Sequence, residues 1–264
     1  MSNQTASILR KALQSGERPF NILTFDTHER YQTQLAKTGH NFYAFKYEGC
    51  KEWVNSYGPK PSNYYTFPKN SVIYSLGIDF ILSQSKFGQF QMAQKISEYF
   101  KLPIISLEHT LPIPSWPPQQ LAEMRQMRGD FNVFISDYSA KQWGIFPYTV
   151  IKHSVDSQLF KPLQKRVSYQ GQENIQMDDW FEDDYRTGRE SYVLSVANDF
   201  RNRDYCLNFS GWERITKGFN VKLVGDNPGM STAAPSIQDL VGEYQKSGVF
   251  LNTSTISPVP TSML

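Results

Sequence analysis

The sequence has only two cysteines among its 264 residues, Cys50 and Cys206, and they lie far apart. Disulfide-stabilised secreted domains contain many more cysteines, and zinc sites have cysteines at short, regular spacings. This pair fits neither. No apolar run approaches the roughly 18 residues that a membrane-spanning helix needs. Residues 1–20 also lack the apolar core of a secretory signal. These absences predict a protein of a reducing compartment, the cytoplasm.

The chain also lacks a large excess of either positive or negative charge. Charged residues make up 20% of the chain and hydrophobic residues 39%, with a net charge of +2, which is the balance of an ordinary globular protein. No basic patch interleaved with aromatic residues is present, so we expect no nucleic-acid partner. Residues 1–157 carry 16 basic residues against 12 acidic ones. Contact of this half with an anionic acceptor or a membrane surface is therefore one hypothesis, and ordinary solvated faces are the simpler alternative.

Short apolar segments alternate with stretches of helical period, which is typical of βα units and a parallel sheet. The first half is expected to form strands at 21–25, 41–45, 72–76, 79–84, 102–108, 131–136 and 149–153. Helices are expected up to about Thr38 and at 88–100, 119–128 and 139–143. The D-x-x-E pattern at Asp26–Glu29 predicts a capping box for the first helix, and Gly39 predicts its left-handed C-terminal cap. Residues 46–70 are expected to form a loop.

A polar, acidic stretch over 163–190 interrupts this rhythm, which then resumes with strands at 192–197, 219–225 and 249–254 and helices at 204–216 and 236–246. The predicted fold class is α/β with two Rossmann-like domains. The first domain covers 1–157, a linker or insertion covers 158–190, and the second domain covers 191–264. Ligands of open parallel sheets bind beyond the carboxyl ends of the strands. The candidate loops therefore follow residues 25, 84, 108, 153, 197, 225 and 254.

The segment IKHSVDSQLFKP, residues 151–162, resembles the H-G-V-D-x-x-x-F-x-P stretch of glycosyltransferase family four, with Ser154 in place of the usual glycine. In the family, a strand and a helix precede this stretch, and residues 132–144 are similar to them. Residues 106–112 are similar to an earlier strand of the family, which ends in a histidine. The resemblance spans most of the chain from Asn21 onward and is strongest over 102–162 and 192–264.

Members of this family are retaining enzymes with two Rossmann-like domains, the GT-B architecture. The resemblance therefore implies transfer of a sugar from a nucleotide-diphosphate sugar to a glycan or lipid acceptor. The first domain would bind the acceptor and the second domain the donor. The resemblance implies no metal, and the acidic pairs at 178–179 and 183–184 read as solvated linker residues. No cofactor other than the donor is expected.

The resemblance also implies site residues. His109, at the end of a strand, would donate or accept a hydrogen bond with the donor sugar, although a structural role is the alternative. In the loop after 197 the family places an Arg and a Lys five residues apart on the diphosphate. Here Asn198 and Arg203 occupy these positions, and Arg201 lies between them. Arginine is a strong phosphate ligand, since charge builds on the leaving diphosphate; a solvated arginine is the alternative.

Two further positions belong to the expected donor site. Gly225, in VGDNPG, resembles the glycine loop after the middle strand of the donor domain, although a plain turn is the alternative. Ser257 falls at the first glutamate of the family's E-x7-E motif, and the second glutamate would be residue 265. We therefore expect the second domain to be incomplete in this sequence and the 264-residue chain to be inactive.

Two other functions stay open. The altered phosphate-binding pair is compatible with a non-catalytic two-domain binding or scaffold protein that has a degenerate donor site. Another Rossmann-type enzyme, such as an epimerase or dehydrogenase, is the third hypothesis. The missing glycine-rich first turn speaks against it.

Overall fold

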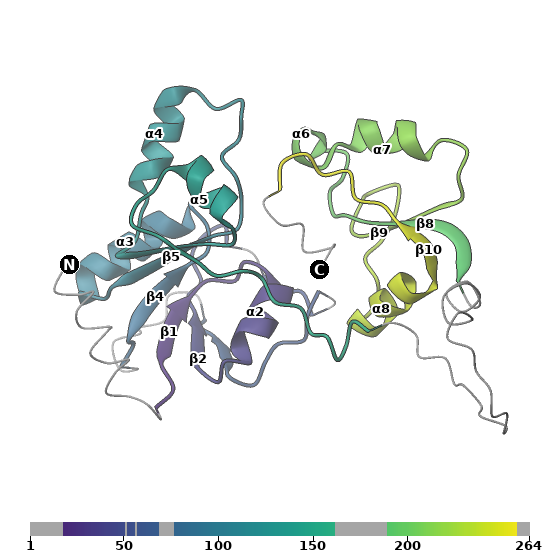
Figure 1. Cartoon of the computed structure of the whole chain (residues 1–264). Coiled ribbons are helices and arrows are strands. Elements are labelled where there is room, and N and C mark those ends of the chain that lie inside the picture. The colour runs from purple at the N-terminus through teal and green to yellow at the C-terminus, as the bar shows by residue number, and fades with distance from the viewer. Residues whose placement is uncertain (1–17, 51, 56, 69–76, 162–188, 258–264) are drawn as a thin grey trace, which may run out of the picture. The chain divides into compact units, whose positions relative to one another are not determined.

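The structure, a computed structural model, describes residues 18–50, 52–55, 57–68, 77–161 and 189–257. It forms two compact units (Figure 1): one comprises Met1–Ser154 with Ile256–Leu264, and the other Val155–Thr255. Each unit is built on a parallel sheet, which confirms the predicted α/β, Rossmann-like class. The strand predicted at 72–76 and most of the predicted linker at 158–190 lie outside the described residues.

The first unit contains a seven-stranded parallel sheet in its described part, with the strand order β3-β2-β1-β4-β5-β6-β7. The strands are β1 (Asn21–Thr24), β2 (Asn41–Ala44), β3 (Tyr64–Thr66), β4 (Phe80–Ser83), β5 (Ile104–Glu108), β6 (Phe131–Phe134) and β7 (Thr149–Val150). The order reverses between β1 and β4. Such a switch point opens a crevice at the carboxyl ends of the strands, where α/β proteins bind ligands.

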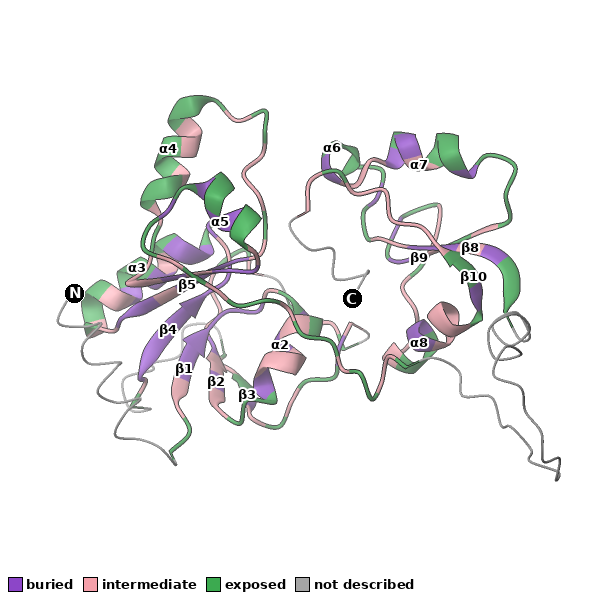
Figure 2. Ribbon diagram, in the orientation of Figure 1, coloured by how far each residue is buried: buried purple, intermediate pink, exposed green. Residues whose placement is uncertain are grey.

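Alternating side chains of the central strands supply two separate cores. On β1, Ile22 packs into a cluster with Leu35 of the helix α2 (Glu29–Ala36), whereas the next residue, Leu23, packs with Phe90 of α3 (Gln89–Phe100). Because successive side chains on a strand point to opposite faces, α2 and α3 cover opposite faces of the sheet. Figure 2 shows β1 and β4 as the most buried elements of this unit.

The remaining helices of the described first unit follow β5 and β6. Helix α4 (Pro118–Gln126) begins with a proline at its first turn, where no intrahelical donor is lost. Helix α5 (Asp137–Trp143) is capped by the hydroxyl of Ser136, which accepts from the Ser139 amide. Trp143 of α5 is fully buried and anchors a third core cluster.

The predicted capping box at Asp26–Glu29 is wrong. His28 is the N-cap residue of α2 and makes no side-chain cap. Asp26 is buried and accepts a hydrogen bond from the Tyr64 hydroxyl at 2.8 Å, while Glu29 accepts from the Val54 amide at 2.9 Å. Both carboxylates thus contact the segment from 52 to 66. The expectation that this segment is only a loop is also wrong, because its β3 pairs with β2 as the edge strand.

The described part of the second unit contains a three-stranded parallel sheet in the order β10-β8-β9. Its elements are β8 (Glu190–Val196), α6 (Asp204–Leu207), α7 (Phe209–Thr216), β9 (Val221–Val224), α8 (Ile237–Lys246) and β10 (Ser247–Phe250). The single helix predicted at 204–216 is interrupted by Asn208, which has a φ of 57° and caps α7 by accepting from the Gly211 amide. Asparagine tolerates this left-handed conformation better than most residues. No helix in the described parts of either unit is long and apolar enough to cross a bilayer.

Gly225 closes β9 where no side chain fits, which gives a direct test of the second unit. Its φ is 140°, and a Cβ atom would lie 1.8 Å from the Ala197 carbonyl oxygen. We expect Gly225→Ala to lower the free energy of unfolding of this unit by roughly 2–4 kcal/mol. In Gly242→Ala, the added methyl group meets nothing within 4 Å in α8, so stability should rise by about 0.5–1 kcal/mol. Hydrogen exchange of the β8 and β9 amides measures the unfolding free energy of the second unit in both variants. Equal changes in the two variants would contradict the proposed clash.

Candidate functional site

Polar side chains gather at the carboxyl edge of the first unit's sheet. Gln84 follows β4, His109 follows β5 and His153 follows β7. Nδ1 of His109 lies 3.1 Å from Nε2 of His153, and Nε2 of His109 lies 3.3 Å from the amide oxygen of Gln84. The Tyr31 ring of α2 contacts both histidines, with ring centroids 4.6 and 5.2 Å away, and the His28 ring lies 6.1 Å from that of His109. We call these five residues the histidine cluster.

The hydrogen-bond partners of the histidine cluster determine which nitrogen carries each proton. The Thr24 hydroxyl donates to the Leu82 carbonyl, so its oxygen accepts from the Gln84 amide nitrogen at 3.4 Å. The amide oxygen of Gln84 then faces His109, whose Nε2 must donate to it. In neutral His109, Nδ1 therefore accepts, and Nε2 of His153 is the donor. Every proton in this chain points inward, from His153 toward β4.

Burial holds these rings in their neutral forms. Burial lowers the pKa of His109 to about 3, with smaller contributions from the neighbouring His28 and His153. Burial likewise lowers the pKa of His153 and raises the pKa of the Tyr31 hydroxyl to about 12. Protonating His109 would add charge in a poorly hydrated position and would also abolish its role as acceptor from His153. The centre of the histidine cluster is therefore uncharged near neutral pH.

Two buried ionisable side chains, Lys86 and Glu108, lie beneath the loop that carries His109. Lys86 is 2% exposed, donates to the Met127 carbonyl and lies 5.2 Å from the centroid of the Trp143 ring. Glu108 is also buried and accepts from both the amide and the hydroxyl of Thr110. The Thr110 carbonyl in turn accepts from the Trp143 indole at 2.8 Å. Burial lowers the pKa of Lys86 and raises the pKa of Glu108, and the charge of each residue opposes the pKa shift of the other. His109 therefore projects from a backbone that is fixed on both sides.

In the second unit, two loops at the carboxyl ends of β8 and β9 are joined by hydrogen bonds. The Asn198 side-chain oxygen accepts from the Asp226 amide at 2.8 Å. Asn227 is 1% exposed; its oxygen accepts from the Phe200 amide, and its nitrogen donates to the Ala197 carbonyl and to the Ser231 hydroxyl. One buried amide thus holds both loops.

The residues predicted to bind the donor occupy different positions. Asn198 and Gly225 come together, since a Cβ atom on Gly225 would lie 2.8 Å from the Asn198 oxygen. Arg201 and Arg203 are exposed in the same β8–α6 loop, with the Arg201 guanidinium 5.2 Å from the Phe209 ring centroid. Ser257 is half-buried and groups with the first unit.

His153, Tyr31 and Asn227 are among the residues of these sites that the sequence did not single out as site residues. His153 was recognised only as part of a structural segment, although it ends a predicted strand and so marks the carboxyl edge. Tyr31 follows His28 by three residues, the spacing that places two side chains on one helical face. Asn227 lies two residues after Gly225, in a loop that was read as a glycine turn. A polar side chain at each strand end was the available signal.

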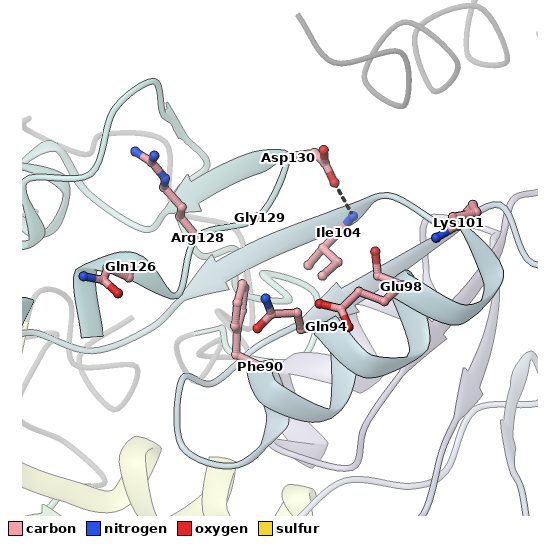
Figure 3. A pocket seen from close by; sticks show the side chains of 10 residues that line it. Phe90, Gln94, Glu98, Lys101, Ile104, Gln126, Arg128, Gly129 and Asp130 are labelled. Atoms are coloured by element: carbon pink, nitrogen blue, oxygen red, sulfur yellow. Dashed lines mark hydrogen bonds between the residues drawn. The ribbon is translucent and has the colours of Figure 1, made fainter. Parts of the chain in front are cut away.

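A hollow of about 400 Å³ lies elsewhere on the first unit (Figure 3). It is lined by Glu98 and Lys101 from the end of α3 and by Arg128 and Asp130 from the segment before β6. The Asp130 carboxylate accepts from the Ile104 amide at 2.9 Å and so closes the start of β5. This hollow is at the amino ends of the strands, away from the edge where parallel sheets bind ligands.

Comparison of the chain with models of protein families finds no match, and comparison with the curated proteins finds none either. The fold and the two loop clusters define the class: an α/β protein with Rossmann-like parallel sheets and polar sites at their carboxyl edges. Among the described residues, no group of three or more His, Cys, Asp or Glu side chains is arranged to hold a metal ion. The contacts found within the histidine cluster are hydrogen bonds and ring contacts.

The lowered pKa of His109 predicts a pH-dependent contribution to stability. The unfolded chain binds a proton near the ordinary histidine pKa of about 6.5, whereas the folded state resists protonation until about pH 3. Acidification below 6.5 therefore favours unfolding. We expect the stability advantage of the wild type over His109→Gln to shrink by roughly 1–2 kcal/mol between pH 7.5 and 5, as measured by urea denaturation. A difference that does not change with pH would contradict the burial of His109.

The two asparagines of the second unit's loops offer a matched comparison. Asn227→Ala removes three side-chain hydrogen bonds and leaves buried backbone groups unsatisfied, so we expect a loss of roughly 2–4 kcal/mol in unfolding free energy. Asn202→Ala removes one exposed bond to Asp199 and should cost less than about 0.5 kcal/mol. Thermal unfolding measures both variants. Equal losses would show that Asn227 does not hold the loops together.

Proposed function

We propose that the protein is a retaining, metal-independent glycosyltransferase of the GT-B type, which transfers a sugar from a nucleotide-diphosphate sugar to a hydroxyl group of a glycan or lipid acceptor. The observation that carries this proposal is the β8–α6 loop, where Arg201 and Arg203 stand exposed at the carboxyl end of a parallel strand. Gly225 ends the neighbouring strand in the same sheet, so the loops after both strands lie at one carboxyl edge. A diphosphate at this edge would be bound by the two guanidinium groups.

The chemistry of sugar transfer explains why cations are needed near the diphosphate. As the bond between the anomeric carbon and the diphosphate oxygen breaks, negative charge accumulates on the diphosphate. Guanidinium groups held near that oxygen stabilise the transition state more than the ground state, and this difference accelerates the reaction. In this proposal Arg203 is the principal ligand, and Arg201 takes the place of the family's missing cation at Asn198.

The first unit would bind the acceptor in the same scheme. Its switch point lies between β1 and β4, and the histidine cluster occupies the adjoining carboxyl edge. Contact between His109 and the donor sugar, which the family resemblance implies, remains a prediction. Both ring nitrogens of His109 have protein partners, so this contact requires the bond to His153 to open.

One observation favours the non-catalytic alternative. At the position where the family has an arginine, the side chain of Asn198 is committed to the Asp226 amide. Such a loop is stable without any ligand, as expected of a binding or scaffold protein whose donor site has degenerated. Nucleotide affinity separates the two functions, because only the transferase needs to hold a diphosphate.

We therefore expect the protein to bind at least one of UDP, GDP and ADP, and Arg203→Ala to weaken that binding about tenfold or more, which is the loss of roughly 1.4 kcal/mol. Arg214→Ala, which removes an exposed arginine from the last turn of α7, is the matched control and should leave the affinity unchanged. Isothermal titration calorimetry measures the nucleotide affinity of the wild type and both variants. If the wild type binds none of the three nucleotides, the result favours the scaffold function.

A further inference from the structure

The hollow at the amino ends of the first unit's strands has two polar walls (Figure 3). One wall is a face of α3, where Gln94, Glu98 and Lys101 follow one another at the four- and three-residue spacings that place side chains on one side of a helix. The other wall is the segment after α4, which contributes Arg128 and Asp130. Each wall therefore carries one acidic and one basic side chain.

The floor of the hollow is apolar. Phe90 and Ile104 line it, and these side chains are only 3% and 5% exposed, so they close its deep end. The volume of about 400 Å³ lies within the range of roughly 300–1,000 Å³ that is usual for small-molecule sites. Such sites combine an apolar surface with a few charged or polar groups that orient the ligand. The hollow has both the size and the composition of a site of this kind.

Both walls are held by hydrogen bonds to the backbone. A Cβ atom on Gly129 would lie 2.5 Å from the Ile104 carbonyl oxygen, so only glycine lets this wall lie directly on β5. The Asn132 side chain accepts from the Gly129 amide at 3.0 Å. On the α3 wall, the Ser97 hydroxyl donates to the Leu102 carbonyl at 2.6 Å. The walls thus keep their shape without using their charged groups.

The charged groups of the hollow do not neutralise one another. Glu98, Lys101 and Arg128 are exposed, and in the part of the chain that the structure describes none of the three forms a hydrogen bond or an ion pair through its side chain. Lys101 has a φ of 56° and so leaves the helical path, which separates it from Glu98. The carboxylate of Asp130 accepts from the Ile104 amide. Positive and negative groups are therefore available to a ligand at the same time.

This arrangement selects ligands by charge. An anion would be attracted by Arg128 and Lys101 but repelled by the carboxylates of Glu98 and Asp130, and a cation would meet the reverse. A ligand with one charge of each sign can pair with both kinds of group. A guanidinium group binds a carboxylate through two parallel hydrogen bonds, and a carboxylate accepts well from an ammonium group. The main-chain groups of a free amino acid supply both partners.

We propose that the hollow binds a zwitterionic amino acid with an apolar side chain. Its carboxylate would pair with Arg128 and its ammonium group with Glu98, while the apolar side chain covers Phe90 and Ile104. Burial of that side chain provides the hydrophobic part of the affinity. This inference goes beyond the proposed function, because the hollow is at the opposite edge of the sheet from the histidine cluster and needs neither a nucleotide nor a sugar.

Ligand titration tests the charge requirement. Leucine, methionine and phenylalanine are added up to about 20 mM, which detects millimolar dissociation constants. At least one of them should shift the backbone ¹H–¹⁵N resonances of Gly129 and Lys101 in a saturable way, while Gly242 in α8 serves as the reference. N-acetyl-leucine, which lacks the ammonium group, and leucinamide, which lacks the carboxylate, should bind at least tenfold more weakly than leucine. No saturable shift with any amino acid, or equal binding of a blocked compound, would overturn the proposal.

Matched variants separate recognition from a general effect of charge. Arg128→Ala and Glu98→Gln change exposed side chains that hold no part of the fold, so we expect a folded protein whose amino-acid affinity is at least tenfold lower. Arg214→Ala and Glu213→Gln make the same changes on α7 and should leave the affinity as it is. Unchanged affinity in Arg128→Ala, or an equal loss in the α7 variants, would contradict the site. Because no nucleotide is present, these results are independent of whether the protein binds UDP, GDP or ADP.

Discussion

The side-chain amide of Gln84 is the constraint on which the first unit's site depends. The residue is 3% exposed, and its amide meets the Thr24 hydroxyl on one side and the His109 ring on the other. A buried amide that lacks either partner is costly, so its orientation is fixed by the sheet. Through His109 this orientation reaches His153, which is half-buried. The interior of the sheet thus determines the chemistry of its edge.

The second unit uses a buried amide for a different purpose. Asn227 joins the loops after β8 and β9 by hydrogen bonds to backbone groups of both, so no charged side chain is needed to hold them. The side chains of Arg201 and Arg203 in the β8–α6 loop are exposed. Because hydrogen bonds fix the backbone of this loop, mainly the arginine side chains would lose freedom on binding a diphosphate, which is the physical basis of the proposed donor site.

Much of the fold could be predicted because it is encoded locally. Apolar runs such as 79–84 and the helical spacing of 88–100 predicted β4 and α3, and the βα alternation predicted parallel sheets. The failures involve residues whose partners are distant in sequence. Asp26 and Glu29 match a capping box, but Tyr64 and Val54 offer partners in a buried setting, and these tertiary contacts prevail. Tyr64 itself forms part of an edge strand whose aromatic sequence resembled a loop.

The candidate sites, like the fold, could be predicted from the sequence only in part. The sequence by itself determined that His109, Arg201 and Arg203 follow parallel strands, because strand ends are visible in the local pattern. Only the tertiary structure decided that His109 faces Gln84 and His153, residues 25 and 44 positions away, and that Asn198 is committed to Asp226. Protonation, tautomer and free hydrogen-bonding capacity depend on such long-range neighbours and on burial. These quantities arise only when the chain has folded, since no local pattern specifies which strand ends become adjacent.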